Sequence, residues 1–386
     1  MKTFLSLTLY MVGAVCYAQW QPDFRLTNDP GASTTSQNNA WCIAASGDVV
    51  HAVWYDDRAG NLEVFYKRST DRGASWQADV QLTHNTGFSY QTSIGASGSI
   101  VHLVWRDNVA GNDEIYYKRS TDAGITWQPD SVRLTNSTGQ SACPSLAVAG
   151  STVHVVWHDN RDGNYEIYYK RSTDEGLTWA ADSRLTNNTS TSQYPSVAVA
   201  GQAVYAVWQD NRDGNDEIYY TRSTDGGLTW QPDVRLTNNT LFSRYPSVAA
   251  SGVFVHVLWQ DFRDGNWRAY YKRSSDGGTT WQADSALTDL MANSQYLSVV
   301  AVASAVHLVW REQRDGNNEI YYKRSTDNGA TWEADVRLTN NTAISREPSV
   351  AVGGQTIHVI WHDLRDGNYE VYYKRNPTGN PTDVRE

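Results

Sequence analysis

Short apolar runs separated by turn residues repeat along the chain with a fixed period. One run ends in a tryptophan at positions 54, 105, 157, 208, 259, 310 and 361, so the copies follow each other at intervals of 51 or 52 residues. In the third copy, four runs rich in Val, Ile, Tyr, Trp and Thr predict strands at 144–149, 153–157, 166–171 and 183–186. Four strands per repeat of this length predict the blades of a β-propeller.

An Asp-Gly pair follows the tryptophan in five copies, for example at Asp162-Gly163. Such a pair predicts a tight hairpin turn in which both central residues have positive φ. Outside the first residues of the chain, no segment has a helical period.

The two ends of the repeat array complement each other. The last copy stops after its third strand, near Arg375, and residues 23–28 form an additional fourth strand behind Trp20. Pairing these ends closes the ring and leaves no exposed sheet edge. We therefore predict an all-β fold over residues 19–386: a seven-bladed β-propeller of four-stranded antiparallel blades, closed by the N-terminal strand.

Residues 1–18 have the features of a secretory signal peptide. Lys2 precedes an apolar stretch at 4–15, and Ala18 ends a small–x–small cleavage site. A lipoprotein anchor at Cys16 is the weaker alternative, because the residues before it do not form a lipobox. The sequence thus predicts a secreted protein, and no second apolar run is long enough to span a membrane.

Composition excludes some partners and chemistries. The formal net charge is -10, which argues against nucleic-acid binding. Beyond the predicted signal peptide only Cys42 and Cys143 remain, too few for a disulfide framework. No cofactor or metal site is indicated, and we expect a monomer.

An eight-residue motif, Ser-Thr-Asp-x-Gly-x-Thr-Trp, stands at 120–127, 172–179, 223–230 and 325–332, with close variants at 69–76 and 274–281. It resembles the Asp-box of BNR repeat proteins in the sialidase-like β-propeller superfamily. That resemblance implies that each Asp bonds to the amides of its own turn, on the face away from the ligand. It assigns a structural role to Asp71, Asp122, Asp174, Asp225, Asp276 and Asp327.

The resemblance also raises the question of sialidase activity. Sialidases use an arginine triad, a Tyr–Glu nucleophile pair and an Asp acid/base, and an Arg-Ile-Pro element supplies one arginine. Here the nearest match is Arg25-Leu26, and Arg-Leu recurs in the same position of other copies. Near-identical blades present the same side chains at each turn of the ring, which suits repeated binding sites better than acid/base chemistry.

Our interpretation is a non-catalytic protein that binds extracellular glycans or glycoproteins. Sialidase-type glycoside hydrolysis (an exo-alpha-sialidase) and an extracellular protein-interaction scaffold are the alternatives. No catalytic residue is assigned.

Candidate ligand-binding residues lie in the loops of one propeller face. Arginines after the tryptophan strand either pair with aspartates and fix the hairpin, or form shallow sites for hydroxyl or acidic groups; they are Arg58, Arg161, Arg212, Arg263, Arg314 and Arg365. Tyr194, Tyr245 and Tyr296 stand 14 residues before a repeat tryptophan and either stack on sugars or pack between blades.

Departures from the repeat concentrate in the fifth copy. Arg244, Phe262, Trp267 and Arg268 depart from the consensus there, and an exposed aromatic beside arginine is a common binding composition. A histidine also recurs in the tryptophan strand, for example His154, and we expect it to form hydrogen bonds between blades.

Overall fold

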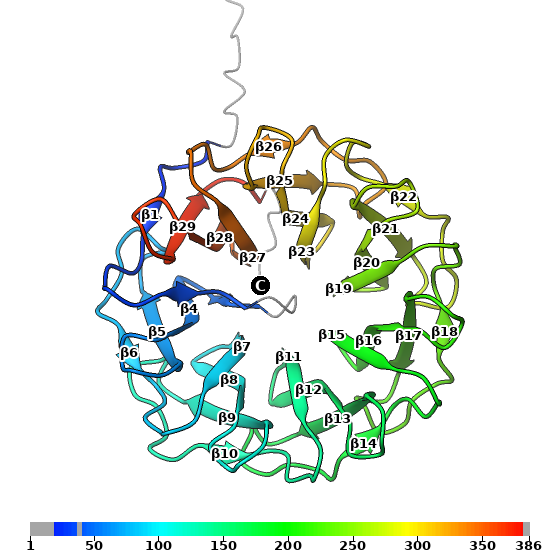
Figure 1. Cartoon of the computed structure of the whole chain (residues 1–386), viewed down its shortest axis with the longest axis horizontal. Coiled ribbons are helices and arrows are strands. Elements are labelled where there is room, and N and C mark those ends of the chain that lie inside the picture. The colour runs from blue at the N-terminus through cyan, green and yellow to red at the C-terminus, as the bar shows by residue number, and fades with distance from the viewer. Residues whose placement is uncertain (1–18, 37–40, 381–386) are drawn as a thin grey trace, which may run out of the picture.

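The computed structural model describes residues 19–36 and 41–380. Its strands form seven antiparallel sheets arranged as blades around one axis, which confirms the predicted seven-bladed β-propeller (Figure 1). The predicted signal peptide at 1–18 lies outside the described residues. Within the described part, no helix is long and apolar enough to cross a membrane.

Each blade contributes its first strand to the wall around the axis. These strands are β2 (Ser33–Thr34) and β3 (Ile43–Ser46) of blade one, then β7 (Ser89–Ser97), β11 (Ser141–Ala149), β15 (Ser192–Ala200), β19 (Ser243–Ser251), β23 (Gln295–Val302) and β27 (Ser345–Gly353). The second strands, which carry the repeat tryptophans, are β4 (Val49–Asp56), β8 (Ile100–Asp107), β12 (Thr152–Asp159), β16 (Ala203–Asp210), β20 (Phe254–Asp261), β24 (Ala305–Glu312) and β28 (Thr356–Asp363).

The two outer positions of each blade complete the ring. The third strands are β5 (Glu63–Ser69), β9 (Glu114–Ser120), β13 (Glu166–Ser172), β17 (Glu217–Ser223), β21 (Arg268–Ser274), β25 (Glu319–Ser325) and β29 (Glu370–Asn376). The fourth strands are β6 (Val80–Gln81), β10 (Val132–Arg133), β14 (Ser183–Arg184), β18 (Val234–Arg235), β22 (Ser285–Ala286), β26 (Val336–Arg337) and, for blade seven, β1 (Phe24–Arg25).

The core lies between the faces of neighbouring blades. Trp157 is fully buried, stands opposite Tyr168 in the register, and stacks on its ring with centroids 5.9 Å apart. Its indole nitrogen donates to Asp159 at the end of the same strand, at 3.3 Å. The strand therefore ends at a carboxylate that accepts a hydrogen bond from the indole N–H, the only polar group of the buried Trp157 ring.

The sequence suggested that the recurring histidines bond between blades, but most of them bond within their own blade; His307, whose Nε2 lies 3.4 Å from Asn380 Oδ1 of blade seven, reaches the next blade. His154 Nδ1 bonds to the hydroxyl of Tyr169 in the same blade, at 2.7 Å. It is this tyrosine that reaches the next blade, where it contacts Gly227 and packs edge-on against Trp230 with ring centroids 4.9 Å apart. A Cβ at Gly227 would lie 1.9 Å from the Tyr169 hydroxyl, so the glycine is required for this close approach.

Ring closure follows the predicted scheme. β1 pairs with β29, and Trp20 packs edge-on against Tyr322 at 4.9 Å, as each box tryptophan packs on the blade before it. Arg365 also pairs with Asp23 at 2.7 Å. The C-terminal part supplies Gly379, whose carbonyl accepts from Arg324 at 2.7 Å. The seventh blade is therefore closed jointly by both ends of the chain.

The Asp-Gly hairpins differ from the predicted two-residue turn. Six residues separate Asp159 from Glu166, and of the Asp162-Gly163 pair only the glycine has positive φ, 106°. The amide of Gly163 donates to the Asn160 carbonyl at 3.0 Å, so the turn begins at Asn160. The larger loop leaves space for the arginine networks described below.

The Asp-boxes lie between third and fourth strands, at the edge of the blade opposite these loops. In the third box, Asp174 accepts hydrogen bonds from the Thr178 hydroxyl (2.6 Å), the Thr178 amide (2.9 Å) and the Ser172 hydroxyl (2.7 Å). These bonds, the Thr178 hydroxyl foremost, lower the pKa of Asp174 to about 2. The carboxylate is used in holding its own turn. Cys42 and Cys143 are both free and buried.

Candidate binding site at the axial mouth

The arginines in the loops between second and third strands, termed here the blade-loop arginines, are Arg58, Arg161, Arg212, Arg263, Arg314 and Arg365. Arg212 is typical: it pairs with Asp210 at 2.6 Å and with Asp233 at 2.7 Å, and its guanidinium lies 4.3 Å from the centre of the Tyr219 ring. Burial works against its charge, but the bonds to Asp210 and Asp233 outweigh burial and raise the pKa of Arg212. The other members pair with carboxylates and lie over a ring in the same way, at 4.1 to 4.4 Å.

Within the described chain, the innermost strands of blades two to seven each have a bulge near their start that re-aims one side chain. The bulge residues have φ between 51° and 54°, a region that non-glycine residues rarely adopt; among the described residues they are Gln91, Cys143, Tyr194, Tyr245, Tyr296 and Glu347. The pairing register shifts at the same point, for example between Gln193 and Ser196. Bulges of this kind re-aim side chains beside functional sites.

Three of these bulge residues form a continuous aromatic arc. The rings of Tyr194 and Tyr245 are 4.6 Å apart, and those of Tyr245 and Tyr296 are 6.0 Å apart. A side chain of the preceding blade holds each backbone amide: Tyr194 donates to His158 at 3.2 Å and Tyr296 to Gln260 at 3.3 Å. The structure thus brings together the three tyrosines singled out in the sequence.

Two arginines continue this arc across blades six and seven. The Arg311 guanidinium lies 4.7 Å from the centre of the Tyr296 ring and donates to the Gln295 side chain. Arg346 lies over the Tyr369 ring at 6.0 Å. Within the described part of the chain, neither arginine lies within 4.0 Å of a carboxylate, and the Nε atom of each is buried without a hydrogen-bond partner.

Burial, the mutual repulsion of the two arginines and one nearby carboxylate, Glu347, set the electrostatics of this pair. Burial is the main cause that lowers the pKa of Arg311, and the charge of Arg346 lowers it further, whereas Tyr296 and the Glu347 carboxylate act in the opposite direction. Burial and Arg346 also lower the pKa of His362 to about 3, so this ring is neutral at pH 7. Glu347 lies beside them, with its carboxylate 3.6 Å from His362 Nδ1. We call Tyr194, Tyr245, Tyr296, Arg311, Arg346 and Glu347 the axial mouth.

The model of the BNR repeat-like domain family matches residues 98–240 and 202–353. The chain belongs to the BNR repeat-like family. This agrees with the boxes at the far edge of the blades and with the sheet order described above.

Two relatives of this chain are named as enzymes. Xyloglucanase Xgh74A of Acetivibrio thermocellus is 25% identical over 250 residues, 56% of this chain and 28% of that protein. A sialidase of Bacteroides fragilis is 22% identical over 235 residues, 52% of this chain and 41% of that protein. The chain therefore spans less than half the length of each.

Solved structures share the fold at low identity. The polysaccharide lyase Uly1 has a TM-score of 0.62 at 10% identity, covering 93% of this chain and 99% of that one. A protein of unknown function from Dyadobacter fermentans has a TM-score of 0.59 at 13% identity, covering 92% and 98%. A Trypanosoma rangeli sialidase mutant has 0.54 at 13%, covering 77% and 55%. These likenesses show the fold alone.

In this BNR propeller, the fifth-blade residues singled out in the sequence lie close together, and their part in ligand binding stays a prediction. Arg244 lies 4.2 Å from the Phe242 ring centre and 6.0 Å from that of Trp267, and it pairs with Asp216 at 2.5 Å. The rings of Phe262 and Trp267 are 5.0 Å apart. Unlike Arg311 and Arg346, Arg244 has a carboxylate partner, so its charge is matched.

Arg268 has a different setting. In blade four, Arg235 of the fourth strand pairs with Glu217 of the third at 2.8 Å. In blade five, Ala286 replaces the arginine and Arg268 replaces the glutamate. Arg268 pairs with Asp264 at 2.6 Å. Blade five therefore still has one arginine at this loop, but the third strand supplies it instead of the fourth. The part of Arg268 in ligand binding stays a prediction.

Sequence reasoning missed Arg311, Arg346 and Glu347. A usable signal was present: the residue after the repeat tryptophan changes from blade to blade while its neighbours stay constant, as Arg106, His158, Gln209 and Arg311 do. The argument that near-identical blades present identical side chains therefore holds for the loop arginines of six blades, with blade two as the exception, but fails at the axial mouth. Among the described residues, no group of three or more His, Cys, Asp or Glu side chains is placed to hold a metal ion.

Proposed function

We propose that this protein is a secreted, non-catalytic glycan-binding propeller whose axial mouth takes an acidic sugar. The observation that carries the proposal is the pair Arg311 and Arg346, two half-buried guanidinium groups with no carboxylate within 4.0 Å among the described residues. A ligand carboxylate would supply the charge that the blades supply to the blade-loop arginines.

The aromatic arc supports a sugar as the carrier of that carboxylate. Tyr296 lies directly beside Arg311, and Tyr245 and Tyr194 extend the ring surface across two further blades. Aromatic faces pack on the C–H faces of sugars, while arginine and the tyrosine hydroxyls bind their polar edges. The relatives named for sialic acid and xyloglucan hydrolysis make glycans the natural ligand class to test.

Sialidase-type hydrolysis is the second candidate, favoured by the proximity of Tyr296 and Glu347. Burial, and then the charge of Glu347, raise the pKa of Tyr296. A raised pKa makes the phenolate harder to form, which is the opposite of what a tyrosine nucleophile needs. Two further mouth-side arginines, Arg106 and Arg244, are already paired with Asp113 and Asp216. We therefore favour binding over hydrolysis.

The test is calorimetric titration with 3′-sialyllactose, digalacturonic acid and neutral lactose. We expect an acidic sugar to bind and lactose not to. Arg311→Gln and Arg346→Gln should each weaken binding about tenfold or more, the effect of losing a charged hydrogen bond. Glutamine occupies the equivalent positions in other blades, at Gln260 for Arg311 and Gln295 for Arg346, so both variants should fold.

Arg72→Gln is the matched control, since this exposed arginine lies at the Asp-box edge and pairs with Asp48. It removes the same charge and should leave binding unchanged. Equal binding of lactose, or full binding by both mouth variants, would overturn the proposal. Turnover of a fluorogenic sialoside that disappears in Tyr296→Phe would replace it with the hydrolase.

A further inference from the structure

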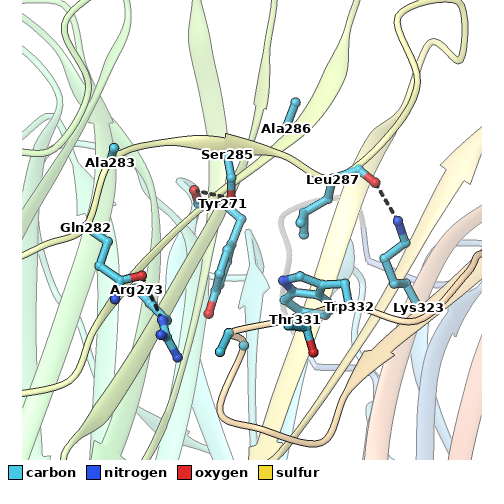
Figure 2. A pocket seen from close by; sticks show the side chains of 12 residues that line it. Tyr271, Arg273, Gln282, Ala283, Ser285, Ala286, Leu287, Lys323, Thr331 and Trp332 are labelled. Carbon is cyan, nitrogen blue, oxygen red and sulfur yellow. Dashed lines mark hydrogen bonds between the residues drawn. The ribbon is translucent and has the colours of Figure 1, made fainter.

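A separate groove opens on the outer rim between blades five and six. It has a volume of about 370 Å³, within the usual range of small-molecule sites. Figure 2 shows the rings of Tyr271 and Trp332 facing the cavity, with Arg273 and Gln282 on one side and Leu287 above. The lining comes from β21, from β22 and its approach, and from the last Asp-box.

The sequence explains why the groove is open here. The first residue of the fourth strand is a partly exposed apolar side chain in five blades, namely Phe24, Val80, Val132, Val234 and Val336. Blade five has Ser285 in this position, and the smaller side chain uncovers the space above Tyr271. Blade three has Ser183 there, and a second groove, of about 240 Å³, opens beside it.

The two grooves differ in their polar groups. Gln282 of the blade five groove accepts from Arg273 Nε at 2.8 Å, whereas Ala180 stands in the same position in the blade three groove. The amide group of Gln282 therefore keeps its own N–H donors at the groove. Of these two grooves, the one between blades five and six combines an amide, a guanidinium and a serine hydroxyl beside the Trp332 ring.

The donors that remain suit hydroxyl groups. Arg273 uses Nε on Gln282 and Nη1 on the Asn328 carbonyl, so each paired-donor face of the guanidinium already has one donor taken. Lys323 pairs with Asp335 at 2.8 Å and donates to the Leu287 carbonyl at 2.7 Å. A carboxylate therefore has no guanidinium face that is free for bidentate hydrogen bonding, whereas a sugar hydroxyl needs only one of the remaining donors.

We propose that this rim groove binds one neutral pyranose unit of a glycan, independently of the axial mouth. The apolar face of the sugar packs on the partly exposed ring of Trp332, above the buried Tyr271, and its hydroxyls bond to Arg273, Gln282 and Ser285. With both sites occupied, one glycan chain or two separate chains are held at the rim and at the axis.

Trp332 provides a local readout. Its indole plane stands at 85° to the Tyr271 ring with centroids 5.2 Å apart, and its Nε1 atom is buried without a hydrogen-bond partner in the described structure. Figure 2 shows this nitrogen on the side toward Tyr271. The N–H resonance of this indole should therefore respond to a sugar in the groove.

The experiment is a titration of ¹⁵N-labelled protein with methyl β-glucopyranoside and methyl β-glucuronide, following the indole N–H signals, with Trp332 assigned from Trp332→Phe. We expect the neutral glycoside to shift the Trp332 signal. Ser285→Val, which installs the residue found in other blades, should abolish the shift. Gln282→Ala, which copies Ala180, should weaken binding up to about tenfold.

Ser183→Val is the matched control, because it closes the groove that lacks the amide; it should leave the Trp332 titration unchanged. Arg346→Gln should do the same, so failure at the rim and failure at the axial mouth are separable. The rim proposal is overturned if Trp332 does not respond, if Ser285→Val still binds, or if the glucuronide binds more tightly than the neutral glycoside.

Discussion

The blade loops and the axial mouth treat the same residue type in opposite ways. At Arg212, a blade-loop arginine, two aspartates and a tyrosine ring satisfy the guanidinium within one blade. At Arg311, in the axial mouth, an aromatic ring and an amide contact the guanidinium, but within the described chain no carboxylate lies within 4.0 Å of it. The repeat therefore builds a self-satisfied frame, and the ligand site that we propose lies where the blades differ.

The largest effect should come from breaking a blade-loop network. Asp210 is fully buried and accepts from Trp208 Nε1, Ser192 Oγ and Arg212. Asp210→Ala leaves the arginine without its closest partner and the indole nitrogen unpaired, so we expect a loss of about 3–5 kcal/mol in unfolding free energy. Chemical denaturation followed by fluorescence measures it.

Blade two offers the matched control, because it has Val109-Ala110 in place of Arg-Asp, and Asp107 is held there by Trp105, Ser89 and a backbone amide. The double variant Arg212→Val, Asp213→Ala copies that blade and should cost less, about 2 kcal/mol. Equal losses in both variants would show that the arginine, not the carboxylate, is the centre of the network.

This contrast also marks how far the sequence could be read. The period of the tryptophans, the missing fourth strand near Arg375 and the additional one after Trp20 were enough for blade number and ring closure, because strands and turns are local and the repeat multiplies the signal. The axial mouth depends on neighbouring blades bringing Tyr296, Arg311 and Arg346 together. That juxtaposition needs the bulge at Tyr296, whose positive φ no local pattern announces.

A smaller effect should appear in the dependence of stability on pH. Burial lowers the pKa of eight histidines to about 3 or 4; they are His51, His102, His154, His158, His256, His307, His358 and His362. Their pKa in the unfolded chain is about 6.5, so between there and pH 4 the unfolded chain binds more protons. Stability should be complete above pH 6.5 and fall as the pH falls through this window.

His154→Tyr tests one member of this set, since blade four naturally has Tyr205 in the same position. The Asp-box of the next blade has a glycine at the same position in both cases: Gly226 in the blade after that of His154, and Gly277 in the blade after that of Tyr205. Removing one proton site should reduce the slope of unfolding free energy against pH by up to about 1.4 kcal/mol per pH unit. An unchanged slope in His154→Tyr would mean that this histidine is already protonated in the fold.

The smallest effect on stability should come from the axial mouth itself. Arg311→Gln removes a half-buried cation that repels Arg346, is attracted by Glu347 and has no carboxylate within 4.0 Å in the described chain. Gln209 and Gln260 hold the same position in blades four and five, where they accept from the backbone amide of the next bulge residue. The unfolding free energy should therefore change by no more than about 0.5 kcal/mol, in contrast to the loss expected for Asp210→Ala. Thermal and chemical denaturation of both variants side by side measure the difference. A loss in Arg311→Gln as large as that in Asp210→Ala would mean that Arg311 stabilises the fold as the blade-loop arginines do. The proposed division between a repeat whose charges are paired and an axial mouth that binds a ligand would then be wrong.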